Sequence, residues 1–265
     1  MLSTLGIIAG SGDLPYELAK IHAAKGGKYI VASIDKNNDT WPFAVQHFDI
    51  GKVSAILEYF QQHQVQEIIL VGGISRPNLT SINVDKAGSV IIAKILKNKF
   101  LGDDNVLQTI SAYLESKGFK VISPKDILQG NYQDITTTAS PSPKESVDIE
   151  LGKKVLNALG LVDVGQSIIA CNAYVLGIEA AEGTDNLIRR CSVLRKQPTG
   201  GVLIKMSKLS QDMRLDVPVI GPETITLLAK FGFQGVAIEK TGVIIIKPEE
   251  TAKLLHEHGL FLRYL

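Results

Sequence analysis

Charged residues of both signs gather beside glycines between Gly177 and Glu223, and this segment is the part of the chain best suited to chemistry. Its polar and charged members include Glu179, Glu182, Thr184, Asp185, Lys205, Lys208, Gln211, Asp212, Arg214 and Asp216. A protein core rarely buries so many charges. A site that holds a divalent cation and a phosphorylated substrate uses this combination of carboxylates and cations.

Asp212, Arg214 and Asp216 alternate with apolar residues. In an extended segment these three side chains would face one way, because successive side chains of a strand point to opposite faces. Two carboxylates on one face can bind Mg²⁺ or Mn²⁺, with water and phosphate oxygens as the remaining ligands. We therefore predict that Asp212 and Asp216 are catalytic residues and metal ligands. The alternative is a solvated edge strand.

The other members of the segment are assigned by their chemistry. Glu179, Glu182 and Asp185 are further candidates for the metal. Lys205 and Arg214 are predicted to neutralise charge that develops on phosphate oxygens, and Lys208 to bind the substrate. Gln211 is predicted to position water or a hydroxyl. Thr184 is a candidate for substrate binding, although a helix N-cap explains it equally well.

Glycines also follow two strands predicted in the first third of the chain. Gly10 and Gly12 stand between a strand and a helix, where backbone amides can face a phosphate. Gly73 follows a later strand, and Arg76 can bind a phosphate or carboxylate through its planar fork. These four residues are predicted to bind substrate. The alternatives are a tight strand-to-helix turn for Gly10 and Gly12, and a loop with a surface arginine for Gly73 and Arg76. Pro15 occupies the place of the third glycine in a dinucleotide fingerprint, which disfavours classical NAD binding.

The pattern of apolar runs predicts an α/β protein of two domains. Residues 1–130 alternate strands and helices, which indicates a Rossmann-like domain with a parallel sheet. Residues 131–146 are rich in Thr, Ser and Pro and are predicted to be a linker. Residues 147–265 are predicted to form a mixed α+β domain that carries the acidic motifs. Hairpins are expected at Asn172-Ala173 and around Lys240 to Gly242.

Bulk properties exclude several classes of protein. The net charge of the 265 residues is +1, so that no overall field attracts nucleic acid. No apolar run reaches the ~18 residues of a transmembrane helix, and Cys171 and Cys191 lack metal-ligand or redox spacing. These features predict a cytoplasmic protein without a transmembrane segment.

Taken in order, the motifs resemble the LpxI family of UDP-2,3-diacylglucosamine pyrophosphatases of lipid A biosynthesis. The resemblance rests on the following residues: Gly10, Gly12, Leu14 and Pro15; Gly72, Gly73, Arg76 and Pro77; Gly102, Asp103 and Asp104; Glu179, Glu182, Gly183, Thr184 and Asp185; Lys205 and Lys208; Gln211, Asp212, Arg214, Asp216, Pro218, Gly221 and Pro222. One departure lies at Leu209-Ser210, where the family usually has proline and glycine.

The resemblance implies hydrolysis of UDP-2,3-diacylglucosamine to 2,3-diacylglucosamine 1-phosphate (lipid X) and UMP, with Mg²⁺ or Mn²⁺ as cofactor. It implies a lipid-linked nucleotide-sugar as partner, and peripheral contact with the inner membrane is compatible with it, as is a homodimer. Two alternatives stay open. One is a non-catalytic nucleotide-sugar or lipid sensor, and the other is an NAD-dependent oxidoreductase, suggested by Gly10, Gly12 and Asp35.

Overall fold

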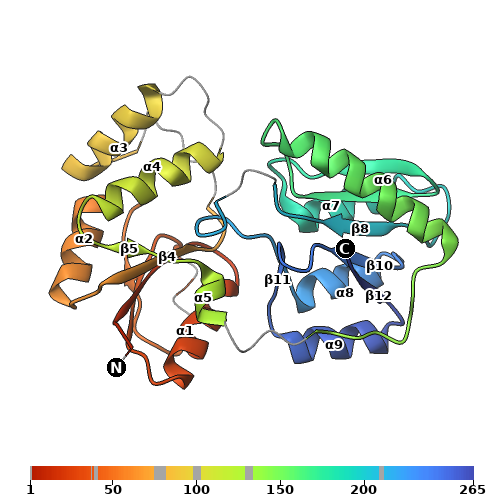
Figure 1. Ribbon diagram of the computed structural model, residues 1–265, viewed down its shortest axis with the longest axis horizontal. Helices are drawn as coiled ribbons and strands as arrows, with labels where there is room; N and C mark the ends of the chain where they lie inside the picture. Colours follow the sequence, from red (N-terminus) through yellow and green to blue (C-terminus); the bar gives the residue numbers. More distant parts are fainter. Residues whose placement is uncertain are drawn as a thin grey trace. The chain divides into compact units, whose positions relative to one another are not determined.

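The computed structural model describes residues 2–36, 38, 41–74, 82–97, 103–128, 134–208 and 212–265. The chain divides into two compact units, which are shown in Figure 1. Unit 1 comprises Met1–Asn131 and Asp212–Asp216, and unit 2 comprises Tyr132–Gln211 and Val217–Leu265. The short segment from Asp212 to Asp216 was expected in the second domain, and it belongs to unit 1 instead.

Unit 1 is built on a five-stranded parallel sheet of order β3-β2-β1-β4-β5. Its strands are β1 (Leu5–Ala9), β2 (Tyr29–Ser33), β3 (Gln46–His47), β4 (Glu67–Val71) and β5 (Lys120–Val121). Its helices are α1 (Leu14–Ala24), α2 (Val53–Gln62), α3 (Lys86–Lys97), α4 (Asp103–Glu115) and α5 (Pro124–Leu128). The chain leaves β1 on one side for β2 and returns to its other side for β4. In open α/β sheets such a reversal is where ligands usually bind.

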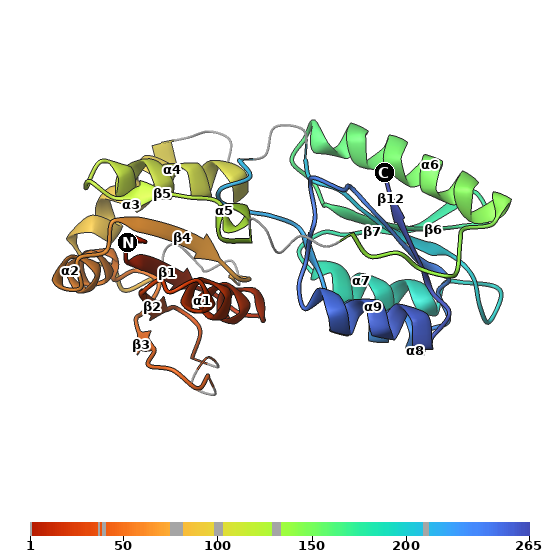
Figure 2. The same ribbon diagram turned by 60° about the horizontal axis from the view of Figure 1, so that its bottom comes forward.

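The core of unit 1 joins α2, α3 and α4 to one face of the sheet. Phe60, Ile91 and Leu114 are each at most 4% exposed and pack with Ile68 of β4. Figure 2 shows α1 on the opposite side of the sheet from α3 and α4. The parallel sheet with its helices confirms the predicted α/β class for this unit, and its likeness to the Rossmann fold stays a prediction.

Unit 2 contains a five-stranded mixed sheet of order β12-β10-β8-β6-β7 and a two-stranded parallel sheet of β11 and β9. Its strands are β6 (Ser167–Cys171), β7 (Tyr174–Ile178), β8 (Val202–Lys205), β9 (Val219–Ile220), β10 (Gly235–Ile238), β11 (Ile244–Ile245) and β12 (Phe261–Tyr264). Its helices are α6 (Pro143–Gly160), α7 (Gly183–Ser192), α8 (Pro222–Lys230) and α9 (Pro248–Glu257). Helix α6 begins inside the predicted linker.

Alternating side chains divide the core of unit 2 between the two faces of its sheet. Ile168 and Ile204 pack against α6, whereas Ile169 and Leu203 pack against the cluster that contains α7, α8 and α9. Figure 2 shows α6 on one side of the sheet and these three helices on the other. The central strands β6, β8 and β10 are therefore buried on both faces, whereas the edge strands β7 and β12 are partly exposed.

One predicted hairpin of unit 2 is confirmed and the other is wrong. β6 and β7 pair antiparallel around Asn172 and Ala173, both of which have positive φ. The backbone amides of this turn donate to Asp148 of α6, which is 2% exposed. The second expected hairpin does not form, because β10 pairs with β8 and β12 while β11 pairs with β9.

No helix among the described residues combines the length and the apolar character that crossing a bilayer requires.

Candidate active site

Two glycine turns meet at the carboxyl edge of the unit 1 sheet, where β1 and β4 end. The Ser11 amide donates to the Gly73 carbonyl over 2.8 Å, and the Gly73 amide donates back to the Ser11 carbonyl over 2.9 Å. The Gly10 amide donates to the Val71 carbonyl over 2.8 Å. A Cβ placed on Gly10 would lie 2.4 Å from the Gly73 oxygen. Glycine is therefore needed because two backbones touch there.

This packing bears on the predicted substrate-binding residues. The amides of Gly10 and Gly73 already have backbone partners, so that close approach of the two turns explains these glycines without a ligand. Gly12 differs, because its φ is 92° and a Cβ there would meet nothing within 4 Å. It precedes Asp13, the N-cap of α1, and the first turn of that helix contains Pro15 and so offers one amide fewer to an anion. Arg76 lies outside the described residues.

A buried asparagine that the sequence analysis did not single out holds this edge in place. Asn38 is 4% exposed, and its side-chain amide donates to the Gly10 carbonyl over 3.1 Å and to the Ser33 hydroxyl over 2.8 Å. The Ser33 hydroxyl in turn donates to the Asp35 carbonyl over 2.7 Å. Asn38 thus ties the turn after β1 to the end of β2. Its local sequence carries no signal for this role.

The segment from Asp212 to Asp216 forms a turn beside the carboxyl end of β5. Leu215 is 5% exposed and belongs to the core cluster of unit 1. The Ser123 hydroxyl, just past β5, donates to the Met213 carbonyl over 2.8 Å. The predicted extended conformation is wrong here, because the Leu215 amide donates to the Asp212 carbonyl and closes a turn. Burial of Leu215 outweighs the alternation that suggested a strand.

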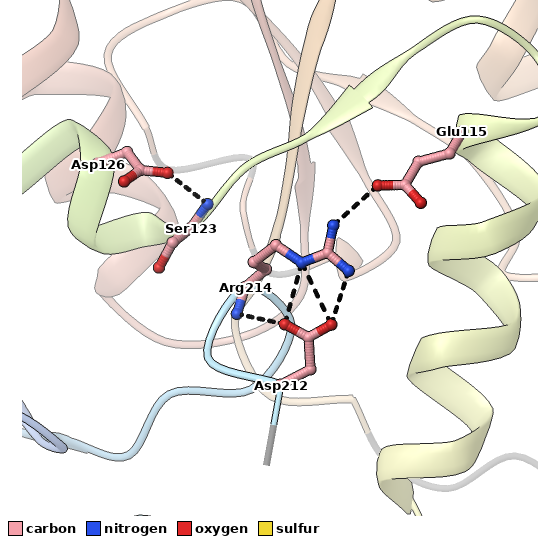
Figure 3. Close-up of polar contacts among 5 residues, drawn as sticks. All are labelled: Glu115, Ser123, Asp126, Asp212 and Arg214. Atoms are coloured by element: carbon pink, nitrogen blue, oxygen red, sulfur yellow. Dashed lines mark hydrogen bonds and ion pairs between the residues drawn. The ribbon is translucent and has the colours of Figure 1, made fainter. Parts of the chain in front are cut away.

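Arg214 curls back onto Asp212 within this turn, as Figure 3 shows. Its Nε lies 3.1 Å from Oδ1 of Asp212, and its Nη2 lies 2.8 Å from Oδ2. Its Nη1 donates to Glu115 at the end of α4 over 2.8 Å. The guanidinium holds the pKa of Asp212 below its usual range, because it donates hydrogen bonds to the ionised carboxylate. Asp212 is therefore an ionised carboxylate with both oxygens engaged.

A second polar cluster lies in unit 2, where β7 and β8 end and α7 begins. Lys205 is 5% exposed, and its ammonium donates to the Thr184 hydroxyl over 2.6 Å. Thr184 donates to Oε1 of Glu179 over 2.9 Å, and the buried Ser167 hydroxyl lies 3.4 Å from that of Thr184. Thr184 thus links the buried cation to Glu179. It stands in the first turn of α7 and does not cap it, since Glu182 is the N-cap residue.

The remaining predicted residues of unit 2 have partners of opposite charge or lie near that cluster. Lys208 pairs with Asp163 at 2.5 Å, and the lysine side chain is 12% exposed. Glu182 pairs with Arg190 at 2.5 Å, and this hydrogen bond lowers the pKa of Glu182. Asp185 is half-buried in the first turn of α7. Gln211 lies outside the described residues.

Comparison with known proteins agrees with the order of these motifs. A family model described as the LpxI N-terminal domain matches residues 4–131, and one described as the LpxI C-terminal domain matches residues 132–263. The chain belongs to the LpxI family. It is also 29% identical over 274 residues to the UDP-2,3-diacylglucosamine pyrophosphatase LpxI of Caulobacter vibrioides, covering 97% of this chain and 96% of that relative.

The carboxylates predicted to bind the metal are divided between the two units of this LpxI family member. Asp212 and Asp216 belong to unit 1, whereas Glu179, Glu182 and Asp185 belong to unit 2. Within the described ranges, no group of three His, Cys, Asp or Glu side chains is arranged to hold a metal ion. Asp212 is engaged by Arg214, and Glu182 by Arg190. Binding of a divalent cation by these carboxylates therefore stays a prediction.

Two buried carboxylate oxygens of unit 2 are among the side-chain atoms that lack a hydrogen bond. Oε2 of Glu179 and Oδ2 of Asp163 are buried and have no hydrogen-bond partner in the part of the chain that the structure describes. Buried carboxylate oxygens nearly always have one, because an unmet acceptor in a protein interior costs free energy. The cluster therefore has unused capacity to accept hydrogen bonds close to Lys205 and Lys208. Asp163 and Ser167 were not selected from the sequence, because Asp163 stands alone in a turn and Ser167 in an apolar strand.

Proposed function

We propose that this protein hydrolyses the pyrophosphate bond of UDP-2,3-diacylglucosamine, giving 2,3-diacylglucosamine 1-phosphate (lipid X) and UMP in lipid A biosynthesis. The observation that carries the proposal is the match of both LpxI domain models in order, with a relative of that named activity covering 97% of the chain. The residues quoted for the resemblance include Lys205, Lys208 and Arg214.

In the proposed reaction, water forms a new bond to one phosphorus and the bond from that phosphorus to the bridging oxygen breaks. The bridging oxygen leaves with the other phosphate, and the attacking water loses a proton. Negative charge grows on the phosphate oxygens, so that positioned cations lower the barrier. Lys205, Lys208 and Arg214 are assigned to these oxygens, and Thr184 and Glu179 to the orientation of Lys205.

The carboxylate roles follow from the contacts of each side chain. Asp212 is assigned to the orientation of Arg214, because both of its oxygens receive hydrogen bonds from that residue. Asp216 closes the same turn through its amide, which approaches the Asp212 carbonyl at 3.5 Å. Mg²⁺ or Mn²⁺ stays a predicted cofactor.

The test is release of UMP from UDP-2,3-diacylglucosamine by the purified protein, with Mg²⁺, with Mn²⁺ and with a chelator. Asp212→Ala and Asp216→Ala are assayed beside the unaltered chain. Metal-dependent release that either variant loses supports the enzyme and its metal. Binding of the substrate without release, by folded protein under every metal, would replace the proposal with the sensor alternative. Reduction of NAD by a hydroxyl substrate would favour the oxidoreductase.

Two further predictions concern partners. The substrate class makes contact with a membrane surface an expectation, and the next subsection assigns that contact to one helix. A homodimer stays a prediction of the sequence, which sedimentation of the purified protein would test.

A further inference from the structure

Helix α3 presents a second apolar face that unit 1 does not bury. Its inner face consists of Ala87, Gly88, Ile91 and Ile95, which are all buried in the core. On the outer side, Val90 is 41% exposed and Leu96 is 62% exposed, with the exposed Ala93 between them. Residues three apart lie along one side of a helix. Val90, Ala93 and Leu96 therefore form an outward apolar row.

The same helix is basic. Lys86, Lys94 and Lys97 are exposed, and the stretch from Lys86 to Lys97 contains no acidic residue. None of these three lysines makes an ion pair with another residue that the structure describes. The ammonium of Lys94 lies 5.8 Å from the ring centroid of Tyr113. The ammonium of the exposed Lys117, in the turn after α4, lies 5.2 Å from the same centroid. Among the carboxylates that the structure describes, none forms an ion pair with Lys86, Lys94 or Lys97.

The geometry points to α3 as a docking helix for the surface of an anionic lipid bilayer. Its exposed row of Val90, Ala93 and Leu96 would enter the boundary between headgroups and acyl chains, while Lys86, Lys94 and Lys97 contact anionic headgroups. A helix that lies in the interface combines an apolar row with flanking lysines in this way. Long lysine side chains keep their charge at headgroup level while their stems cover apolar surface.

The charge pattern distinguishes a bilayer from other occupants. A second copy of the chain docked through the same face would set lysines against lysines, which costs free energy. An anionic surface meets all of the lysines with charges of the opposite sign, and each lysine near such a surface contributes attraction. The exposed apolar residues Val193 and Leu194, which follow α7, differ because two of the arginines beside them are engaged. Arg190 pairs with Glu182, and Arg195 donates to the carbonyls of Gly200 and Gly232.

The inference rests on the proposed function in one respect, since a diacylated substrate would be presented by a bilayer. The experiment is nevertheless independent of activity. Full-length protein is sedimented with vesicles of phosphatidylglycerol and phosphatidylcholine in equal parts, and with vesicles of phosphatidylcholine alone. We expect binding to the anionic vesicles only, weakening as salt increases because ions screen the attraction. Failure here would overturn the docking helix and leave UMP release unaffected.

Substitutions test whether the contact with the vesicles lies on α3. Lys94→Gln and Lys97→Gln should each weaken vesicle binding roughly fivefold, which corresponds to the attraction of one lysine near an anionic surface. Leu96→Ser should weaken binding to the same vesicles without changing its dependence on salt. Lys20→Gln and Lys36→Gln remove charge from exposed positions elsewhere in unit 1, and Val193→Ser removes exposed apolar surface in unit 2. These controls should bind as the unaltered protein does.

Two results would overturn the inference. One is equal loss of binding in the control variants, which would indicate attraction to the whole protein rather than to α3. The other is a change in oligomeric state on Leu96→Ser with vesicle binding intact, which would make this face a contact between copies of the chain. Thermal unfolding followed by circular dichroism verifies that each variant is folded. Because the substituted positions are exposed, the melting temperature of each variant should lie within a few degrees of that of the unaltered protein.

Discussion

The cation of the unit 1 turn and the cation of the unit 2 cluster differ in what neutralises them. Arg214 is 43% exposed in its side chain and makes ion pairs with Asp212 and Glu115. Lys205 is 5% exposed, and its recorded partner is the neutral hydroxyl of Thr184. An exposed ion pair is screened by water, whereas a buried charge acts over a lower effective dielectric. The charge of Lys205 is therefore screened less than that of Arg214 and acts more strongly on a bound anion, although Arg214 makes more contacts.

The largest expected effect comes from removing the Lys205 charge while keeping its length. We expect Lys205→Met to lower kcat for UMP release by roughly 10²–10³, the usual loss for one electrostatic stabiliser. The melting temperature should change by only a few degrees, because Thr184 keeps its bond to Glu179. Lys240→Met is the control, since that lysine is 54% exposed and pairs with an exposed Asp134. Near-full activity in Lys205→Met would show that Lys205 is not the more important of these two cations.

A double-mutant cycle tests whether Asp212 acts through Arg214. We expect Asp212→Asn and Arg214→Gln each to lower kcat on the order of a hundredfold, and the double variant to be no worse than either single one. Residues that act as one unit show such non-additivity. The cycle is measured by steady-state release of UMP. Additive losses would assign Asp212 a separate role, such as binding the metal.

The exposed pair of Glu150 and Lys153, 3.2 Å apart on α6, serves as the matched control for that cycle. Its single and double variants should leave kcat unchanged, because surface ion pairs contribute little.

The hydroxyl bridge of unit 2 should have a smaller effect. We expect Thr184→Val to lower kcat roughly tenfold, because a hydrogen bond to a charged group contributes on the order of 1.5–3 kcal/mol, and only part of that is lost when Lys205 moves. Thr184→Ser restores the hydroxyl and should recover most of the activity. Thr109→Val is the control, since its hydroxyl donates to the Asn105 carbonyl within α4. Equal activity of the Thr184→Val and Thr184→Ser variants would show that the Thr184 hydroxyl does not contribute to catalysis.

The smallest effect concerns stability in acid. The pKa of Asp212 is lowered by Arg214, so the folded state binds a proton less readily than the unfolded chain. The resulting stabilisation is present above the unfolded pKa of about 3.9 and is lost as the pH falls through the lower folded value. Asp212→Asn should remove this dependence, changing the free energy of unfolding between neutral and acid pH by less than about 1 kcal/mol.

Urea unfolding at pH 7 and below pH 3 measures that difference, with the exposed Asp49→Asn as control. A variant whose acid dependence equals that of the unaltered chain would show that the ion pair does not form in solution.

Several elements followed from local sequence. α2 runs from Val53 to Gln62, where apolar residues recur at helical spacing, and Pro222 and Pro248 stand in the first turns of α8 and α9. The turn at Asn172 and Ala173 was recognised from its position between two apolar runs. Each of these features depends on residues within a few positions of one another, where backbone preference and side-chain spacing act directly.

Other elements depended on distant partners. Ile244 and Ile245 read as the second strand of a hairpin, yet they pair with Val219 and Ile220. The partner of a strand depends on which strand edges remain accessible once the core has packed. The sequence of a short apolar run does not specify that partner. Similarly, Asn38 and Ser123 position site segments through contacts with residues far away in the chain.

The sequence by itself determined the α/β class, most helices, and the list of charged residues that resembles one family. Only the tertiary structure decided that Asp212 to Asp216 leave their sequence neighbours and pack into unit 1, and that Arg214 engages Asp212 while Lys205 is bridged to Glu179 by Thr184. The physical reason is burial. Placing Leu215 in the unit 1 core and Lys205 at the end of a buried strand fixes where their charged neighbours lie, and burial depends on the whole fold.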